Sequence, residues 1–578
     1  MKRYILLLRY AVVWIAASIC LTSCNNLFED APVNKLTEES IWKDAQLLDS
    51  YVAGWYRNLD NGFKVSATSI TTSFKPWWGD QLTVGVNSPG DLNSFISGTQ
   101  KTISSVATNE WGKRYGQIQV VNRMFDNADK IPDGDQKQMT LGEGHFFLAY
   151  HHFCLFRLFG GIPLTNGSYD PMNSGKTLPR ASYDEMVTYI TNEALKAAEL
   201  LPAQQTATNL GRATKGAALM IAAKTYMWAA GKPFQNQTKD YLGFTTDKSK
   251  EMLQKASDIY DQIMKLGVYS LLAANGSTQD DIATAYTKIF LTKNSIESIF
   301  EIQHNEIITR YGHTLDKDAI PPSLGGTVAA YTPTQNHVDE YEMRDNKTYD
   351  PQHPYDNRDY RFYANILYDG STYAGKTLKI HSVNNGTTIQ ADVDARPYSG
   401  RTDGYSKTGY YMRKFLDPSQ KITTDYKTGS KQNYIVWRYA EVLLDKAEIS
   451  FRLGDQATAL KCVNEVRNRI HATPLTTITL DNILHERRIE LAFEETSYWD
   501  ILRLGEAEQR LSGATNPLKK MYIEINSTTG KTTYTVSNLN KTPETARLFN
   551  DFQYHLCIPW EEVDYQHFDQ NPGWKRNE

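Results

Sequence analysis

The spacing of apolar residues predicts a chain built mainly from α-helices. Apolar side chains recur every three or four positions in several blocks, which places them on one face of a helix. The clearest stripe consists of Ala440, Leu443, Leu444, Ala447 and Phe451. Four further blocks are each followed by glycine or proline, residues that end helices. They cover residues 143–159, 182–201, 213–230 and 251–266.

Helices near the C-terminus follow one another closely. Gly454 suits the left-handed backbone position that follows many helices, and Asp455 can cap the helix that comes next. A third helix is expected over residues 480–495, where apolar residues on more than one face indicate burial. Recurring helix pairs of this length look like tetratricopeptide-type hairpins.

The pattern changes between about residues 270 and 435. Residues 296–302 and 360–368 read as short strands, and Gly, Asn, Asp, Pro and Tyr fill the long segments around them. Loops of this length in a compact protein are usually functional or disordered, and their many aromatic residues favour order. We therefore predict an irregular region with short β-strands that carries the ligand-binding function.

The N-terminus has the pattern of a lipoprotein export signal. Three cations lie among the first nine residues, and the apolar run from Ala11 to Leu21 is too short to span a bilayer. Leu21-Thr-Ser-Cys24 then has the form of a bacterial lipoprotein processing site. We predict a signal peptide over residues 1–23, lipidation of Cys24 and one domain over residues 24–578. An ordinary secretory signal with a cysteine near its cleavage site is the alternative.

Charge and cysteine content exclude several classes of function. The chain has 62 Lys and Arg against 66 Asp and Glu, a net charge of −4. It lacks the basic excess of a protein that binds phosphate chains, so nucleic acid is not an expected partner. Beyond Cys24 only Cys154, Cys462 and Cys557 remain. Their wide spacing gives neither a disulfide framework nor a zinc knuckle.

Residues 370–377, Gly-Ser-Thr-Tyr-Ala-Gly-Lys-Thr, fit the phosphate-loop pattern GxxxxGK[ST] at every position. A phosphate loop needs a helix directly after it, so that backbone N–H groups and the helix N-terminus point at the phosphates. Residues 378–383 instead alternate like a strand. We therefore predict a β-hairpin turn and no nucleotide site.

Other motifs of catalytic or metal sites are incomplete. His151 and His152 are neighbours on a helix, so their side chains diverge by about 100° and cannot share one metal ion. Residues 404–408, Gly-Tyr-Ser-Lys-Thr, lack the last glycine of the nucleophile motif GxSxG. We predict no metal ligand and no cofactor.

Three carboxylates, Glu486, Glu490 and Glu494, share one face of the last predicted helix. Arg487 and Arg488 lie beside them, which favours a salt-bridged helix surface over the carboxylate pair of a glycosidase. No catalytic residue is therefore predicted.

Aromatic residues in loops are the better candidates for function. A sugar ring has an apolar C–H face and a rim of hydroxyl groups, so it suits a flat aromatic side chain with polar neighbours. Trp77 and Trp78 lie among turn residues, where bulky side chains are costly without a purpose. For any single aromatic residue, packing in the core is the more common role. The candidate ligand-binding residues are Trp77, Trp78, Asp80, Tyr311, His313 and Tyr331.

Several segments occur in an order that is specific as a set. After the lipoprotein site they include residues 28–32 (FEDAP), 156–164 (FRLFGGIPL), 211–215 (GRATK), 438–444 (RYAEVLL), 463–469 (VNEVRNR), 486–494 (ERRIELAFE) and 570–574 (QNPGW). Together they resemble the SusD/RagB family, glycan-capture lipoproteins of Bacteroidetes-type bacteria.

The resemblance implies about four tetratricopeptide-like helix pairs that bear an irregular ligand-binding region. It also implies a lipid-anchored protein on the surface of the outer membrane. Such a protein holds an oligosaccharide over a TonB-dependent SusC-type transporter and does no chemistry on it. A scaffold that binds peptides or proteins is the first alternative, and a surface glycosidase is a less favoured one. The sequence does not name the glycan.

Overall fold

The computed structural model describes residues 38–60, 62–63, 78–83, 102, 104–165, 167–169, 177–307, 312–326, 328–395, 404–420, 429–539 and 547–576. The predicted signal peptide and Cys24 lie outside these residues. The helices are α2 (Glu38–Lys43), α3 (Ala45–Arg57), α5 (Ser105–Phe125), α6 (Asp135–Phe159), α8 (Tyr183–Leu200), α9 (Lys215–Ala229), α10 (Ser249–Lys265), α11 (Gln279–Leu291), α12 (Leu315–Ala319), α13 (Gln335–Asp339), α14 (Tyr360–Asn365), α15 (Tyr439–Arg452), α16 (Gln456–Arg469), α17 (Leu480–Glu490), α18 (Thr496–Leu504), α19 (Ala507–Leu511) and α20 (Trp560–Gln566).

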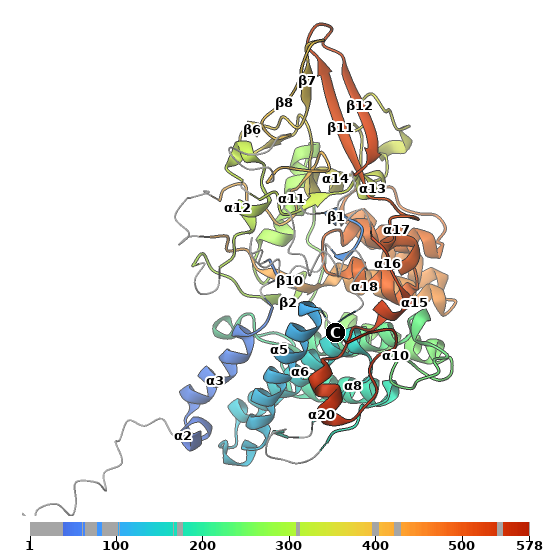
Figure 1. Ribbon diagram of the computed structural model, residues 1–578. Coiled ribbons are helices and arrows are strands. Elements are labelled where there is room, and N and C mark those ends of the chain that lie inside the picture. The colour runs from blue at the N-terminus through green and yellow to red at the C-terminus, as the bar shows by residue number, and fades with distance from the viewer. Residues whose placement is uncertain are drawn as a thin grey trace, which may run out of the picture.

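The long helices pack against one another in chain order. Helix α5 contacts α6, and the series continues through α8, α9 and α10. Helix α10 then packs against α15, although the loop-rich region separates the two in sequence, and α15 packs against α16 and α17. In Figure 1 this series forms the lower and right-hand parts of the molecule. The predicted mainly-α class is confirmed, and the stack is consistent with tetratricopeptide-like hairpins.

Local capping fixes the ends of these helices. The Ser182 hydroxyl accepts a hydrogen bond from the Glu185 N–H, and the Glu185 carboxylate accepts one from the Ser182 N–H, so α8 starts with a complete capping box. Asp455 caps α16 as predicted, and Gly454 has a positive φ of 93°. Helix α9 is buried on nearly all sides, because its many alanines let α8 and α10 approach closely.

The last predicted helix is shorter than expected. Helix α17 ends at Glu490, and α18 begins at Thr496. Between them Phe493 has a φ of 64°, and its N–H donates to the Gln81 side chain at 3.1 Å. The Ala492 carbonyl accepts a hydrogen bond from the buried Lys414 ammonium at 2.7 Å. Partners from distant parts of the chain therefore replace the helical hydrogen bonds that the sequence pattern predicts.

The strands are short except in one hairpin. They are β1 (Leu82–Thr83), β2 (Ser298–Ile302), β3 (Thr332–Pro333), β4 (Ile366–Leu367), β5 (Thr372–Tyr373), β6 (Lys376–Thr377), β7 (Ser382–Asn384), β8 (Ile389–Ala391), β9 (Tyr411–Met412), β10 (Tyr434–Arg438), β11 (Lys519–Asn526) and β12 (Thr532–Asn538). One four-stranded sheet has the order β12-β11-β7-β8 and projects at the top of Figure 1. The other strands form two-stranded pairs, of which β1 with β3 and β2 with β10 are antiparallel.

Two predictions for the loop-rich region are confirmed and one is corrected. Strand β2 matches the prediction for residues 296–302, and residues 370–377 form the β5–β6 hairpin, turned by positive φ angles at Ala374 and Gly375. Residues 360–368 were predicted as a strand but begin with helix α14. The Asp359 carboxylate accepts a hydrogen bond from the Arg361 N–H and so caps a helix that the aromatic residues alone disfavour.

A buried ion network joins the helical stack to the loop-rich region. The Arg438 guanidinium lies 2.8 Å from Glu297 and 2.7 Å from both Glu490 and Glu494. Arg469 also pairs with Glu297 and Glu490. All five side chains are at most 10% exposed. The carboxylates of α17 are therefore salt-bridged as predicted, but they lie in the interior and not on a helix surface.

The same face of α17 receives a third guanidinium group from α14. Arg361 lies 2.5 Å from Glu486 and 3.1 Å from Glu490. Burial alone would raise the pKa of Glu490, but Arg469, Arg438 and Arg361 together hold it well below its ordinary value. Glu490 therefore stays ionised in the interior.

Removal of the negative charge of Glu490 should destabilise the whole fold. We expect Glu490→Gln to lower the free energy of unfolding by about 3–5 kcal/mol, because it leaves buried guanidinium groups without a full counter-charge. Urea denaturation of both proteins measures the difference. The control is Glu39→Gln, which removes an exposed pair with Lys43 and should leave the midpoint unchanged. Equal midpoints for Glu490→Gln and Glu39→Gln would contradict the role of the network.

Acid should weaken the fold through carboxylates with lowered pKa. Burial would raise the pKa of Glu448, but Arg503 lowers it to about 2. An unfolded glutamate titrates near 4.3. Its stabilising contribution is therefore complete above about pH 5 and is lost as the pH falls from about 4 towards 2. We expect the free energy of unfolding, measured with urea from pH 6 to 3, to fall less steeply below pH 4 in Glu448→Gln than in the unaltered protein.

Candidate ligand-binding site

Four of the six predicted ligand-binding residues lie inside the protein. Trp78, Asp80, His313 and Tyr331 are each at most 2% exposed. The Trp78 ring packs edge-on against Tyr498, with 5.3 Å between ring centroids. A ring enclosed in this way has no open face on which a sugar could stack.

The polar members of this set make internal contacts. Asp80 lies 3.0 Å from Arg488 and 3.4 Å from Arg510, and so fixes the start of β1 to α17. The His313 ring contacts Phe63, and its Nε2 lies 2.9 Å from the Gln432 carbonyl oxygen. These side chains do not form the exposed platform that we predicted; they serve packing, the more common role. Trp77 and Tyr311 lie outside the described residues and stay predictions.

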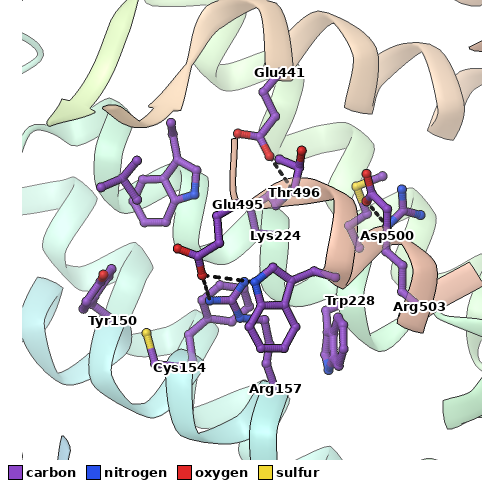
Figure 2. Close-up of a pocket in the computed structure, with 15 residues that line it drawn as sticks. Tyr150, Cys154, Arg157, Lys224, Trp228, Glu441, Glu495, Thr496, Asp500 and Arg503 are labelled. Carbon is purple, nitrogen blue, oxygen red and sulfur yellow. Dashed lines mark hydrogen bonds and ion pairs between the residues drawn. The ribbon is translucent and has the colours of Figure 1, made fainter. Parts of the chain in front are cut away.

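A pocket lies between α6, α9, β10 and α18, and we call it the helical pocket (Figure 2). Its space is about 670 Å³, including solvent at its mouth. Three basic and three acidic residues line it together with several aromatic ones. The lining residues are Tyr150, Phe153, Cys154, Arg157, Lys224, Met227, Trp228, Val436, Trp437, Glu441, Glu495, Thr496, Trp499, Asp500 and Arg503.

Several charged and aromatic groups in the helical pocket contact one another. The Arg157 guanidinium lies 4.1 Å from the centroid of the Trp499 ring and covers it. The Trp499 indole N–H donates to Glu495 at 3.1 Å, and Glu495 also lies 3.7 Å from Arg157, to which a dashed line joins it in Figure 2. Lys224 pairs with Glu441 at 2.6 Å. Burial raises the pKa of Glu441 despite this partner. With its aromatic faces and charges engaged, this pocket supports the scaffold.

A second hollow lies between α3 and the end of β2. Tyr56 and Arg57 line it on one side, and Gln303 and His304 on the other. The Tyr56 hydroxyl donates to Glu143 at 2.7 Å and accepts from the Ala213 N–H at 2.8 Å. The only aromatic residue of α3 at this hollow is therefore fixed by internal hydrogen bonds.

The third hollow lies against the four-stranded sheet, and we call it the sheet pocket. Its space is about 960 Å³, which includes solvent on its open side. Residues from β1, β7, β11 and the segment before β9 contribute to it. The lining residues are Thr83, Ile380, Ser382, Ala395, Tyr405, Ser406, Lys407, Gly409, Lys520, Met521, Tyr522, Ile523 and Leu539.

Hydrogen bonds at Ser406 fix one wall of the sheet pocket. The Ser406 hydroxyl donates to the Tyr410 carbonyl at 2.6 Å and accepts from the N–H groups of Thr408, Gly409 and Tyr410. Ser406 is buried and is no exposed nucleophile, as the incomplete GxSxG motif predicted. Burial alternates along this segment, so that Tyr405 and Lys407 are the partly exposed residues.

The segment is tied directly to the sheet. The Met521 N–H donates to the Thr408 carbonyl at 2.9 Å. Gly409 has a φ of 86°, and a Cβ atom there would lie 2.4 Å from the Met521 carbonyl oxygen. Only glycine therefore allows this close approach. Tyr405 and Lys407 line the pocket together with Lys520 and Tyr522 of β11.

The sheet pocket offers the groups that a carbohydrate needs. Tyr405 is partly exposed and Tyr522 is 38% exposed, and Thr83 and Ser382 add hydroxyl groups. Sequence reasoning missed both tyrosines. The alternation of apolar and polar residues in β11 could have indicated a strand there, but nothing in the sequence links that strand to residues 405–409.

The described residues also bear on metal binding and on membrane insertion. No group of three or more His, Cys, Asp or Glu within them is placed to hold a metal ion. No helix within the same residues is long and apolar enough to cross a bilayer.

Comparisons with known proteins match both halves of the chain. The model of the SusD family matches residues 296–574, and a model described as "Starch-binding associating with outer membrane" matches residues 33–227. SusD-like protein P2 of Formosa agariphila is 23% identical over 516 residues, which cover 86% of this chain and 90% of that protein.

Solved structures show the same fold. A SusD-like carbohydrate binding protein from Bacteroides fragilis has a TM-score of 0.71 at 21% identity, over 93% of this chain and 100% of that one. A laminarin binding SusD-like protein has a TM-score of 0.65 at 19% identity, over 92% of this chain and 100% of that one. The family matches and the shared fold extend over the helical stack and the loop-rich region alike. The chain therefore belongs to the SusD/RagB family.

Proposed function

We propose that this protein binds an oligo- or polysaccharide at the cell surface without cleaving it and delivers it to a TonB-dependent SusC-type transporter. The observation that carries the proposal is the sheet pocket, where Tyr405 and Tyr522 stand beside hydroxyl and ammonium groups. Family membership supports it, since one matching model is described as starch-binding and one similar structure as laminarin binding.

The lining of the sheet pocket supports binding without catalysis. Glycoside hydrolysis commonly uses two carboxyl groups about 5–10 Å apart on either side of the bond. The lining residues that the structure describes include no Asp and no Glu. A sugar held there would meet aromatic rings, hydroxyls and ammonium groups, which bind but do not supply the acid and the nucleophile.

The N-terminal sequence supports a lipid anchor, and the family supports a place on the outer membrane. Lipidation of Cys24 would hold the protein on the outer membrane, and one matching family model is described as associating with that membrane. Trp77 and Tyr311 remain proposed ligand contacts. Trp77 precedes β1 in sequence, and Thr83 at the end of β1 lines the sheet pocket.

The tyrosines of the sheet pocket should carry glycan binding. We expect Tyr405→Ala and Tyr522→Ala each to weaken binding about tenfold or more, because each removes a stacking face. Affinity electrophoresis against a panel of polysaccharides measures retardation, and a reducing-sugar assay tests for cleavage. Tyr565→Ala is the control, since Tyr565 is similarly exposed but lies on α20, far from the sheet in Figure 1. If glycan binding is unchanged in both pocket variants, the sheet pocket is not the glycan-binding site. Selective binding of peptides would favour the scaffold alternative.

Substitutions of the two neighbouring tryptophans should have different effects, on glycan binding for Trp77 and on stability for Trp78. We expect Trp77→Ala to weaken glycan binding about tenfold. Trp78→Ala should instead lower the free energy of unfolding by about 3–5 kcal/mol, because it leaves a cavity beside Tyr498. Electrophoretic retardation and urea denaturation of both variants measure the two effects. Unchanged glycan binding in Trp77→Ala would exclude Trp77 from the site.

A further inference from the structure

The charge of the sheet pocket differs from that of the chain as a whole. Lys407 and Lys520 line it, and its described lining residues include no carboxylate and no histidine. The chain as a whole has more acidic than basic residues, with a net charge of −4. The helical pocket, by contrast, balances three basic against three acidic residues. The sheet pocket is therefore locally positive in an acidic protein.

The two lysines have no anionic partner in the described part of the chain, and both are only partly exposed. Two carboxylates on the surrounding elements make hydrogen bonds of their own. Glu524 of β11 accepts one from the Asn384 side chain at 2.9 Å and one from the hydroxyl of the pocket residue Tyr522 at 3.3 Å. Asp394 accepts from the Ser323 N–H at 2.8 Å and from its hydroxyl at 2.9 Å. Nothing described in the pocket wall neutralises Lys407 or Lys520.

An ammonium group that has no carboxylate partner within the protein can pair with an anionic group of a ligand. A neutral sugar can accept a hydrogen bond from a lysine, but it gives no charge in return. A carboxylate or sulfate group does, and it pairs well with the compact charge of an ammonium group. The hydrogen bond between the Met521 N–H and the Thr408 carbonyl fixes the backbone next to Lys407 against β11, so this lysine is placed at the pocket before a ligand arrives.

We propose that the sheet pocket selects acidic glycans, meaning oligosaccharides that carry carboxylate or sulfate groups, through Lys407 and Lys520. The tyrosines provide stacking for any sugar ring, and the lysines discriminate between charged and neutral chains. This inference rests on the proposed glycan-binding function and names its substrate class.

The test uses matched ligands and matched variants of the mature chain. The ligands are polygalacturonate and its carboxyl-reduced form, and a sulfated galactan and its desulfated form, so that the charge changes while the sugar backbone stays. The variants are the double substitution Lys407→Gln with Lys520→Gln and the control Lys531→Gln. Lys531 is an exposed lysine in the turn between β11 and β12 and lies outside the pocket.

We expect at least one acidic glycan to bind about tenfold more tightly than its neutral form, with affinity that falls as salt rises. The double variant should lose this preference and most of the salt dependence, and Lys531→Gln should keep both. The carboxylate and sulfate pairs identify which anion the pocket accepts.

Two results would overturn the inference, and they are distinguishable from failure of the proposed function. If a neutral glycan binds as tightly as its acidic form, or if the double variant keeps the preference, the lysines do not select charge, although binding that depends on Tyr405 and Tyr522 still supports glycan capture. If no glycan of either kind binds, the proposed function itself fails.

Discussion

The structure depends on keeping ionised side chains paired in its interior. Helix α17 places Glu486 and Glu490 in the core, where each meets guanidinium groups from other elements. Arg361 comes from α14 in the loop-rich region, Arg438 ends strand β10 directly before α15, and Arg469 ends α16 of the helical stack. A buried charge without a partner is far more costly than a poorly packed apolar group. The two parts of the molecule are therefore fixed relative to each other around α17.

Helix α17 also positions β1, and the last residue of β1 lines the sheet pocket. The Gln81 amide accepts a hydrogen bond from Phe493 just after α17 and donates one to the Arg488 carbonyl. Arg488 also holds Asp80, so the chain enters β1 from a fixed point. Thr83 then ends β1 at the pocket. Asp80, one of the predicted ligand contacts, thus helps to position one edge of the sheet pocket.

Sequence reasoning predicted what depends on local pattern and missed what depends on distant partners. Apolar stripes and caps predicted α8 close to its observed bounds and correctly placed α15 and the start of α16, because these signals lie within a few residues. The end of α17 and the start of α14 depend on Gln81, Lys414 and the Asp359 cap, so the local pattern misled there.

The candidate binding site was harder to predict, because its residues come together only through contacts between distant parts of the chain. Trp78 looks like a ligand contact because tryptophan is unusual among turn residues, yet Tyr498 encloses it. Tyr405 and Tyr522 line the same pocket because the Thr408 carbonyl accepts a hydrogen bond from Met521 of β11. Hydrogen–deuterium exchange with and without the most strongly retained glycan tests this account most directly. It predicts that the glycan protects residues 404–411 and 519–525, whereas protection confined to the helical pocket, at residues 150–157 and 496–503, would contradict it.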